Sequence, residues 1–173
     1  MNAPEMYTFS LVTGDRPGVL VRIALVFARR GYNIESLAVS PGATPGFARM
    51  TIVSRGAPDN VEQILKQLAK LVDVVFVTDH RGEQPLESEI ALVKLRCEGE
   101  MRARALQIAE RFGARVQDET AGRVILTMHG PSADINALLE ELEPCKLEEL
   151  VRSGKIVMDR GASQFAHLLG SKR

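Results

Sequence analysis

Residues 14–20 (GDRPGVL) combine two glycines and a proline between a β-rich run and a helix-like segment. This composition is typical of loops that bind phosphate groups through backbone amides. A Walker-type loop, however, continues with lysine and serine or threonine, whereas Val19 and Leu20 follow Gly18 here. The G-x-G-x-x-G spacing of a dinucleotide-binding turn is absent as well. The spacing therefore argues against a nucleotide site.

The same stretch can bind a smaller anion. Pro17 suits the first position of a helix, where the missing N–H would be unpaired anyway. Gly18 has no Cβ, so a ligand can come close to the backbone. The amides of Gly18 and Val19, at the positive end of the helix, then form a small carboxylate site. The side-chain oxygen of Asn33 can accept a hydrogen bond from the ligand's ammonium group. From these residues alone, an ordinary capped helix and an amino-acid pocket both stay open.

Other reactive side chains form no catalytic or metal-binding set. The three histidines are isolated, with His80 in a linker, His129 at a strand end and His167 in the C-terminal tail. We expect all three at the surface. Cys97 and Cys145 lie far apart in apolar, strand-like segments and form no CxxC pair, which predicts buried free thiols in a reducing compartment.

A βαββαβ pattern positions the loop. The predicted strands and helices are Met6–Val12, Pro17–Arg30, Asn33–Ser40, Phe47–Ser54, a helix capped by Asp59 or Asn60, and Asp73–Thr78. Apolar residues recur at helical spacing in both helical segments, and Gly31 suits the left-handed cap after the first. The turn PGATPG joins the middle strands as a hairpin.

The pattern then repeats. The second set is Glu89–Cys97, Met101–Phe112 ended by Gly113, Ala114–Glu119, Arg123–His129, Ala133–Leu142 capped by Ser132, and Lys146–Val151. We therefore predict an α+β fold of two tandem ferredoxin-like domains. Their bounds are 1–79 and 88–161, with a polar linker at 80–87 and a tail at 162–173 whose role is open.

In this fold both helices cover one face of the sheet. Phe47, Arg49, Thr51 and Val53 are then predicted on the other face of the first sheet, which is awkward in water because it is partly apolar. Another copy of the chain, the second domain or a different subunit can cover it. A partly hydrated face is the alternative.

Composition restricts the function classes. The 173 residues contain 22 Lys plus Arg and 22 Asp plus Glu, so there is no basic excess of the kind that nucleic-acid binding through phosphates usually requires. Hydrophobic residues make up 45%, enough for a buried core. The sequence shows neither a secretion signal nor an apolar run long enough to span a bilayer, so we expect a soluble, cytoplasmic protein without a membrane partner.

GDRPGVL, followed by a helix and RGYNIESL, resembles the ACT domain, a ferredoxin-like module that often senses amino acids. A narrower resemblance follows from the order of several segments. They are RRGYNIESLAVSP, ARMTIV, QLAKLVDVVFV, EIALVKL and EELVRSGKIVMDRG. From about Tyr7 to Gly161 the chain is similar to the small, regulatory subunit of acetolactate synthase (acetohydroxyacid synthase).

That resemblance implies a non-catalytic subunit in branched-chain amino acid biosynthesis. Members of the family form homodimers through their ACT domains, bind valine or another branched-chain amino acid (leucine or isoleucine) there, and activate and regulate the catalytic subunit. That catalytic subunit carries thiamine diphosphate, magnesium and FAD, so no cofactor is expected on this chain. The effector-binding positions implied by the resemblance are Asp15, Pro17, Gly18, Val19, Leu20, Asn33 and Ile34. Gly18 and Val19 would bind the carboxylate, and Asn33 and Ile34 would contact the amino group and side chain from across the dimer.

Asp15 departs from the family, which tends to have asparagine at this place. A carboxylate there either contacts the bound amino acid, attracting its ammonium and repelling its carboxylate, or only caps the helix. The alternative function is a stand-alone ACT-type sensor that regulates another enzyme or transcription. The neutral charge and the missing helix-turn-helix pattern argue against a DNA-linked version.

Overall fold

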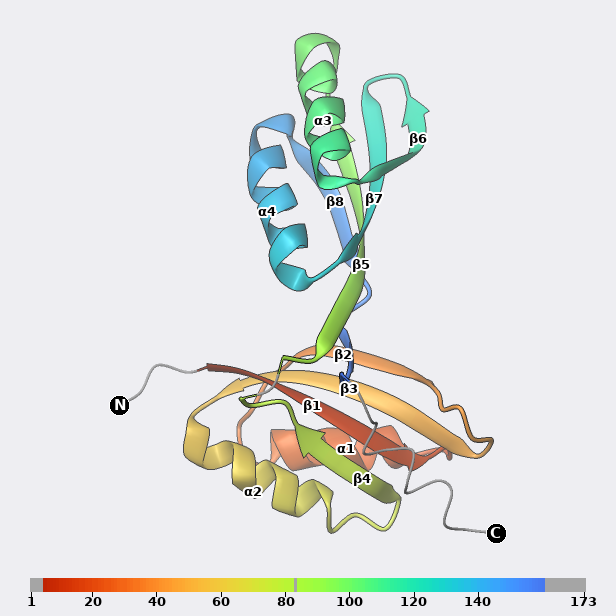
Figure 1. The fold of residues 1–173 in the computed structure, drawn as a ribbon, viewed down its shortest axis with the longest axis vertical. Helices are drawn as coiled ribbons and strands as arrows, with labels where there is room; N and C mark the ends of the chain where they lie inside the picture. The colour runs from red at the N-terminus through yellow and green to blue at the C-terminus, as the bar shows by residue number, and fades with distance from the viewer. Residues whose placement is uncertain (1–4, 83, 161–173) are drawn as a thin grey trace. The chain divides into compact units, whose positions relative to one another are not determined.

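The computed structural model of the chain describes residues 5–82 and 84–160 (Figure 1). Its packing separates two units. The first unit contains the residues up to Leu86 together with those from Lys155, and the second is Glu87–Gly154. The sequence boundaries instead assigned everything from 88 to 161 to the second domain. The tail at 162–173 and His167 lie outside the described residues.

The first unit has the predicted βαββαβ order. Its elements are β1 (Glu5–Gly14), α1 (Val19–Ala28), β2 (Ile34–Pro41), β3 (Phe47–Gly56), α2 (Pro58–Leu68) and β4 (Val74–Asp79). The strands form an antiparallel sheet in the order β2-β3-β1-β4, with Phe9 opposite both Ile52 and Asp79. Both helices lie on the same side of this sheet (Figure 1). The predicted ferredoxin-like fold is confirmed for this unit.

The core of the first unit follows the two periodicities of the sequence. Alternate strand residues and one stripe of each helix are buried together: Tyr7, Phe9, Leu11, Met50, Ile52, Val19, Ile23, Phe27, Val61, Ile64 and Leu68. The rings of Phe9 and Phe27 meet edge to face, with centroids 5.8 Å apart and planes at 77°. This aromatic pair fixes α1 against the centre of the sheet.

The second unit repeats the plan. Its elements are β5 (Leu86–Arg96), α3 (Gly99–Phe112), β6 (Arg115–Thr120), β7 (Arg123–Gly130), α4 (Ser132–Leu142), the 3₁₀ turn η1 (Glu143–Cys145) and β8 (Leu147–Arg152), with strand order β6-β7-β5-β8. Gly113 ends α3 with a left-handed φ of 68°, as predicted. Cys97 and Cys145 are buried free thiols, although Cys97 lies just after β5 and Cys145 lies in η1 rather than in strands. Burial raises the pKa of both thiols, so they stay protonated and unreactive at neutral pH.

The predicted starts of all four helices differ from the structure, and α3 begins at Gly99 rather than at Met101. α1 begins at Val19 rather than at Pro17, and Gly18 is its N-cap. α2 begins at Pro58, whose fixed φ and missing N–H suit the first turn, so Asp59 and Asn60 are helical residues. α4 begins at Ser132 itself, after Pro131. A short strand, β9 (Ile156–Met158), was not predicted.

Among residues 5–82 and 84–160, no helix combines the length and the apolar character that crossing a bilayer would require.

The Phe9–Phe27 contact yields a stability prediction. Phe27 is completely buried, so Phe27→Ala leaves a cavity and we expect a loss of about 3–5 kcal/mol in the free energy of unfolding of the first unit. Denaturant unfolding with hydrogen exchange at the β1 and β3 amides measures it. Val21→Ala, on the same helix at a position with 61% exposure, is the control and should change stability by less than about 0.5 kcal/mol. A loss below about 1 kcal/mol for Phe27→Ala would contradict this account.

Candidate functional site

The turn between β1 and α1 is tied to the sheet at its start. The Gly14 amide donates to the Asp73 carbonyl at 2.8 Å, and the Asp15 amide donates to the Gly46 carbonyl at 2.9 Å. The next residues, through Gly18, are exposed. The turn is therefore held in place by neighbouring strand ends while its outer surface stays accessible.

Gly18 gives this turn its form. Its φ of 84° lies in the left-handed region, where other residues are strained, and no side chain caps the helix that follows. A Cβ at Gly18 would lie 3.3 Å from Nη1 of Arg22. The Val19 amide makes only a long hydrogen bond, 3.4 Å, to the Arg16 carbonyl. The first amides of α1 are consequently available to an anion at the positive end of the helix.

The predicted residues of this turn divide into two kinds. The side chain of Val19 belongs to the core and only its backbone can reach a ligand. Asp15 and Pro17 are exposed, and Leu20 is 40% exposed. Asp15 makes no capping hydrogen bond to α1, so the interpretation of Asp15 as a helix cap is wrong. Its carboxylate lies at the surface of the turn instead.

Asn33 and Ile34 lie at the other end of α1. The helix has ten residues, which at 1.5 Å per residue separates its ends by about 15 Å. The hydroxyl of Ser54 donates to the Asn33 carbonyl at 2.7 Å, which fixes the backbone while the Asn33 side chain stays exposed. Ile34 is partly buried against the core. One chain therefore does not bring the two halves of the predicted site together.

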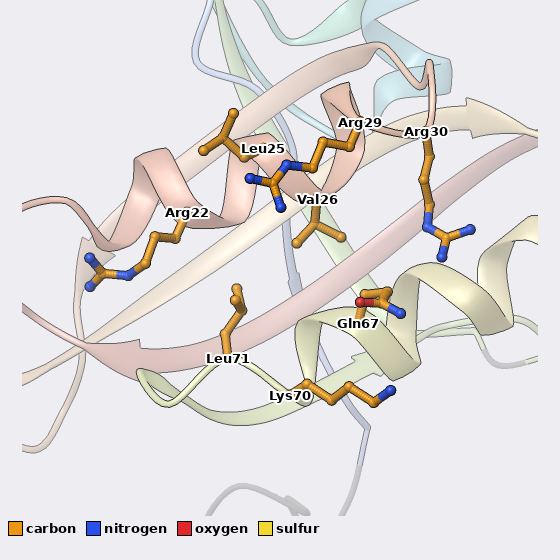
Figure 2. Close-up of a pocket in the computed structure, with 8 residues that line it drawn as sticks. All are labelled: Arg22, Leu25, Val26, Arg29, Arg30, Gln67, Lys70 and Leu71. Carbon is orange, nitrogen blue, oxygen red and sulfur yellow. The ribbon is translucent and has the colours of Figure 1, made fainter.

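A groove between α1 and α2 was not predicted (Figure 2). It has a volume of about 560 Å³ and is lined by Arg22, Leu25, Val26, Arg29, Arg30, Gln67, Lys70 and Leu71. Arg22 forms an ion pair with Asp73 at 2.6 Å, and Arg30 donates to the side chain of Gln63. The spacing of Arg22, Arg29 and Arg30 beside the buried stripe of α1 was the available sequence signal.

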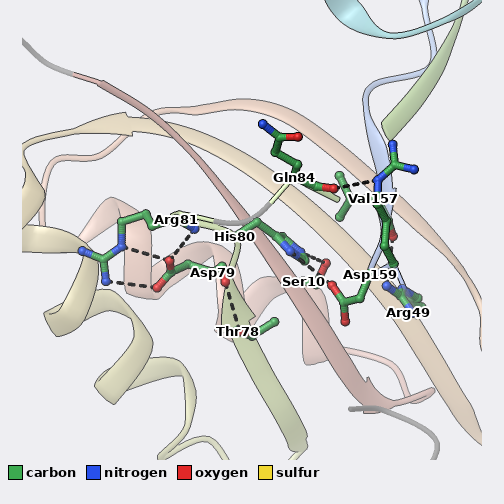
Figure 3. Close-up of polar contacts among 10 residues, drawn as sticks. Ser10, Arg49, Thr78, Asp79, His80, Arg81, Gln84, Val157 and Asp159 are labelled. Atoms are coloured by element: carbon green, nitrogen blue, oxygen red, sulfur yellow. Dashed lines mark hydrogen bonds and ion pairs between the residues drawn. The ribbon is translucent and has the colours of Figure 1, made fainter. Parts of the chain in front are cut away.

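A buried polar cluster lies on the face of the sheet away from the helices (Figure 3). Ser10 Oγ and His80 Nε2 are 2.9 Å apart, and His80 Nδ1 lies 3.3 Å from Asp159 Oδ1. The prediction that His80 is a surface residue is wrong, because its side chain is only 3% exposed. His129, in contrast, is exposed as expected.

The serine, histidine and aspartate of this cluster contact one another in the same order as in a serine hydrolase triad, but the serine is not placed where a substrate could reach it. Ser10 lies in the middle of β1, paired on one side with Thr51 and on the other with Thr78, and is completely buried. A nucleophile must reach its substrate, which is impossible for a hydroxyl sealed within the sheet. The cluster is therefore structural.

The cluster holds residues Lys155–Arg160, with which the chain returns to the first unit after the second unit is complete. This segment is called here the C-terminal strap. Arg49 Nη2 donates to the Val157 carbonyl at 2.9 Å, and Arg160 Nε donates to the Gln84 carbonyl at 2.9 Å. Burial lowers the pKa of the Arg49 guanidinium from its usual value, and the Asp159 carboxylate acts in the opposite direction. The strap covers part of the sheet face for which the sequence had suggested another copy, the second domain or a different subunit.

The comparisons with known proteins agree with this architecture. A family described as "AHAS small subunit-like ACT domain" matches residues 9–76, and one described as "Small subunit of acetolactate synthase" matches residues 88–161. The chain belongs to the acetolactate synthase small-subunit family. The resemblance inferred from the sequence is thereby confirmed, and the family is that of the regulatory, ACT-domain subunit rather than the catalytic one.

Relatives of the small subunit match over nearly their whole length. The acetolactate synthase small subunit of Mycobacterium leprae (strain TN) is 39% identical over 155 residues, which cover 90% of this chain and 92% of the relative. The probable small subunit of Methanothermobacter thermautotrophicus is 38% identical over 160 residues, covering 92% and 95%. The crystal structure of the Thermotoga maritima small subunit superimposes with a TM-score of 0.81 at 34% identity, covering 91% of this chain and 99% of that one.

The contacts of the strap predict a measurable effect of Asp159→Ala. The substitution removes the carboxylate beside the buried His80 and the partly buried Arg49, and we expect the strap to open more easily by about 1–3 kcal/mol. Amide hydrogen exchange at residues 155–160 should then accelerate by about tenfold or more. Asp118→Ala, at an exposed position of β6, is the matched control. Unchanged exchange in the Asp159 variant would show that the cluster does not hold the strap.

Proposed function

We propose that this small subunit activates the acetolactate synthase catalytic subunit and makes it sensitive to feedback inhibition by valine or another branched-chain amino acid. The observation that carries the proposal is the division of the effector site. The glycine turn before α1 and the side chain of Asn33 lie at opposite ends of one domain, so a single ligand can contact both only if two copies combine.

The edge of the ACT sheet favours such a combination. β2 is at the end of the strand order, and Val39 on this strand is 47% exposed. If two β2 edges pair antiparallel about a two-fold axis, the start of β2 in one copy meets the end of β2 in the other. The end of β2 lies near the glycine turn, because the Asp15 amide is bonded to Gly46 in the β2–β3 hairpin. Asn33 of one copy then approaches Gly18 of its partner.

The flank of α1 that faces away from α2 supports the same pairing. Leu20, Ala24 and Ala28 are four residues apart and therefore share one side of the helix, opposite the groove residues. They carry no charge, and Leu20 and Ala28 are exposed in the single chain. A small, uncharged helix flank beside an open strand edge is a suitable dimer surface.

The chemistry of the two halves suits an apolar amino acid. The first-turn amides at Gly18 and Val19 take its carboxylate, the oxygen of Asn33 takes its ammonium, and Leu20 and Ile34 provide apolar contacts for its side chain. An affinity of about 10 μM corresponds to roughly −7 kcal/mol, which a few charge-assisted hydrogen bonds and one buried aliphatic group can supply. Asp15 lies beside the carboxylate position and weakens binding by repulsion.

In this proposal the chain contributes no cofactor. Thiamine diphosphate, magnesium and FAD belong to the catalytic subunit, which condenses pyruvate with pyruvate or 2-oxobutyrate. The small subunit acts by binding that enzyme and by changing its activity when the effector site is filled, which requires a coupling free energy between the two.

The activation prediction is tested with the catalytic subunit of the same host. We expect the two chains to co-purify, and the acetolactate synthase rate to rise by about tenfold when this chain is added, a typical allosteric coupling. Valine, leucine and isoleucine are then added separately to the complex and to the catalytic subunit alone. No binding and no change in rate would contradict the main proposal.

The effector prediction concerns Asn33. Asn33→Ala removes the amide that receives the ammonium, and we expect calorimetry to show about tenfold weaker binding of the inhibitory amino acid, the worth of one hydrogen bond to a charged group. Asn33→Asp keeps an accepting oxygen and is the matched control, with affinity retained. The melting temperature without ligand should be the same in both, since only the exposed side chain changes. Equal affinity of wild type and Asn33→Ala would place the effector elsewhere.

A further inference from the structure

The groove between α1 and α2 concentrates positive charge in a chain whose formal net charge is zero. Four of its lining residues are cationic and none is acidic. Arg22 is paired with Asp73, and Arg30 is bonded to Gln63. Within the described part of the chain, Arg29 and Lys70 take part in no ion pair. The groove therefore carries two positive charges, on Arg29 and Lys70, that form no ion pair within the described residues.

The second unit shows that this charge is not a general property of the fold. Its corresponding groove, between α3 and α4, is lined by Arg104, Gln107, Ile108, Arg111 and Glu141. There Arg111 is paired with Glu141, so one of the two cations is neutralised inside the groove. The same architecture thus occurs twice in one chain, and only the groove of the first unit lacks an acidic lining residue.

The arrangement of the groove favours an extended ligand over a compact anion. The guanidinium of Arg22 lies at one end, Arg30 and Lys70 lie toward the other, and the side chain of Arg29 runs back toward Leu25 (Figure 2). Arg22 and Arg30 lie at opposite ends of the groove, so the cations do not converge on one point (Figure 2). Apolar side chains, Leu25 and Leu71 among them, lie between the charged ends, and Leu25 is 42% exposed. Apolar contacts bordered by charges are typical of protein-binding surfaces.

The groove is also separate from the proposed dimer surface. Its α1 residues lie on the flank opposite Leu20, Ala24 and Ala28. A homodimer formed through β2 and that uncharged flank therefore leaves the groove open in both copies.

We propose that the α1–α2 groove of the ACT domain binds an acidic segment of the catalytic subunit, with apolar residues against Leu25 and Leu71 and carboxylates against Arg29 and Lys70. The inference rests on the proposed function, because it assigns a surface to that partnership. Charged groups at the border of an interface steer association and fix its register more than they add affinity.

The test compares two double variants with the same change in net charge. Arg29→Glu with Lys70→Glu reverses the unpaired charges of the groove and leaves the Arg22–Asp73 pair intact. Arg104→Glu with Arg115→Glu makes the same change on exposed positions of the second unit. Affinity for the catalytic subunit and activation are measured at low and at high salt. We expect the groove variant alone to bind about ten- to a hundredfold more weakly at low salt, with the difference from wild type shrinking at high salt.

Further measurements separate the possible outcomes. Arg29→Gln with Lys70→Gln removes charge without adding repulsion and should show a smaller loss in the same direction, while melting temperature and homodimer mass stay those of wild type. Unchanged affinity of the groove variant, or equal loss in both double variants, would overturn the proposal. So would loss of the homodimer, or binding of inorganic pyrophosphate at the groove with undisturbed binding of the catalytic subunit. If the wild-type chain fails to bind the catalytic subunit at all, that result contradicts both the proposed function and the assignment of this surface.

Discussion

A sheet whose helices all lie on one face leaves a second face to be covered, and the first unit is organised around this constraint. Strand alternation directs Phe9 and Ile52 to the helices and Ser10 and Thr51 to the opposite side, yet all four are buried. The C-terminal strap supplies part of the cover. Its polar contacts to Arg49 and His80 set its position, and Val157 adds apolar surface that is only 5% exposed.

Most of the fold was predictable because it depends on local periodicity. Alternating and 3.6-residue patterns identify strands and helices from their own residues, and a turn such as PGATPG forces the chain to reverse. Helix starts were less accessible. Asp59, Asn60 and Ser132 have good capping side chains, but none of them is the N-cap. Pro58 is the first residue of α2, and Pro131 is the N-cap of α4.

The features that escaped prediction depend on residues distant in sequence. Ser10, His80 and Asp159 meet only after the chain has completed the second unit and returned. The α1–α2 groove likewise joins two helices through side chains that look like ordinary solvated charges when each helix is considered alone. The turn before α1 is a local feature, since Gly18 needs no distant partner to adopt its left-handed φ, and its role as an effector site stays a prediction. The separation of this turn from Asn33 follows from the length of α1, which the helical spacing of apolar residues in the sequence already indicates.

The position of β2 at the end of the sheet has a consequence for self-assembly. An unpaired strand edge can add any other edge, and a head-to-tail join of β2 to β4 of the next molecule would leave one edge free at each end and continue into a filament. Pairing β2 with β2 stops after two molecules. The β4 edge is bordered by Asp73, paired with Arg22, and by Asp79, bonded to Arg81. Fixed charges at both ends of β4 disfavour strand addition there, so the proposed β2–β2 pair would stay closed rather than continue into a fibre.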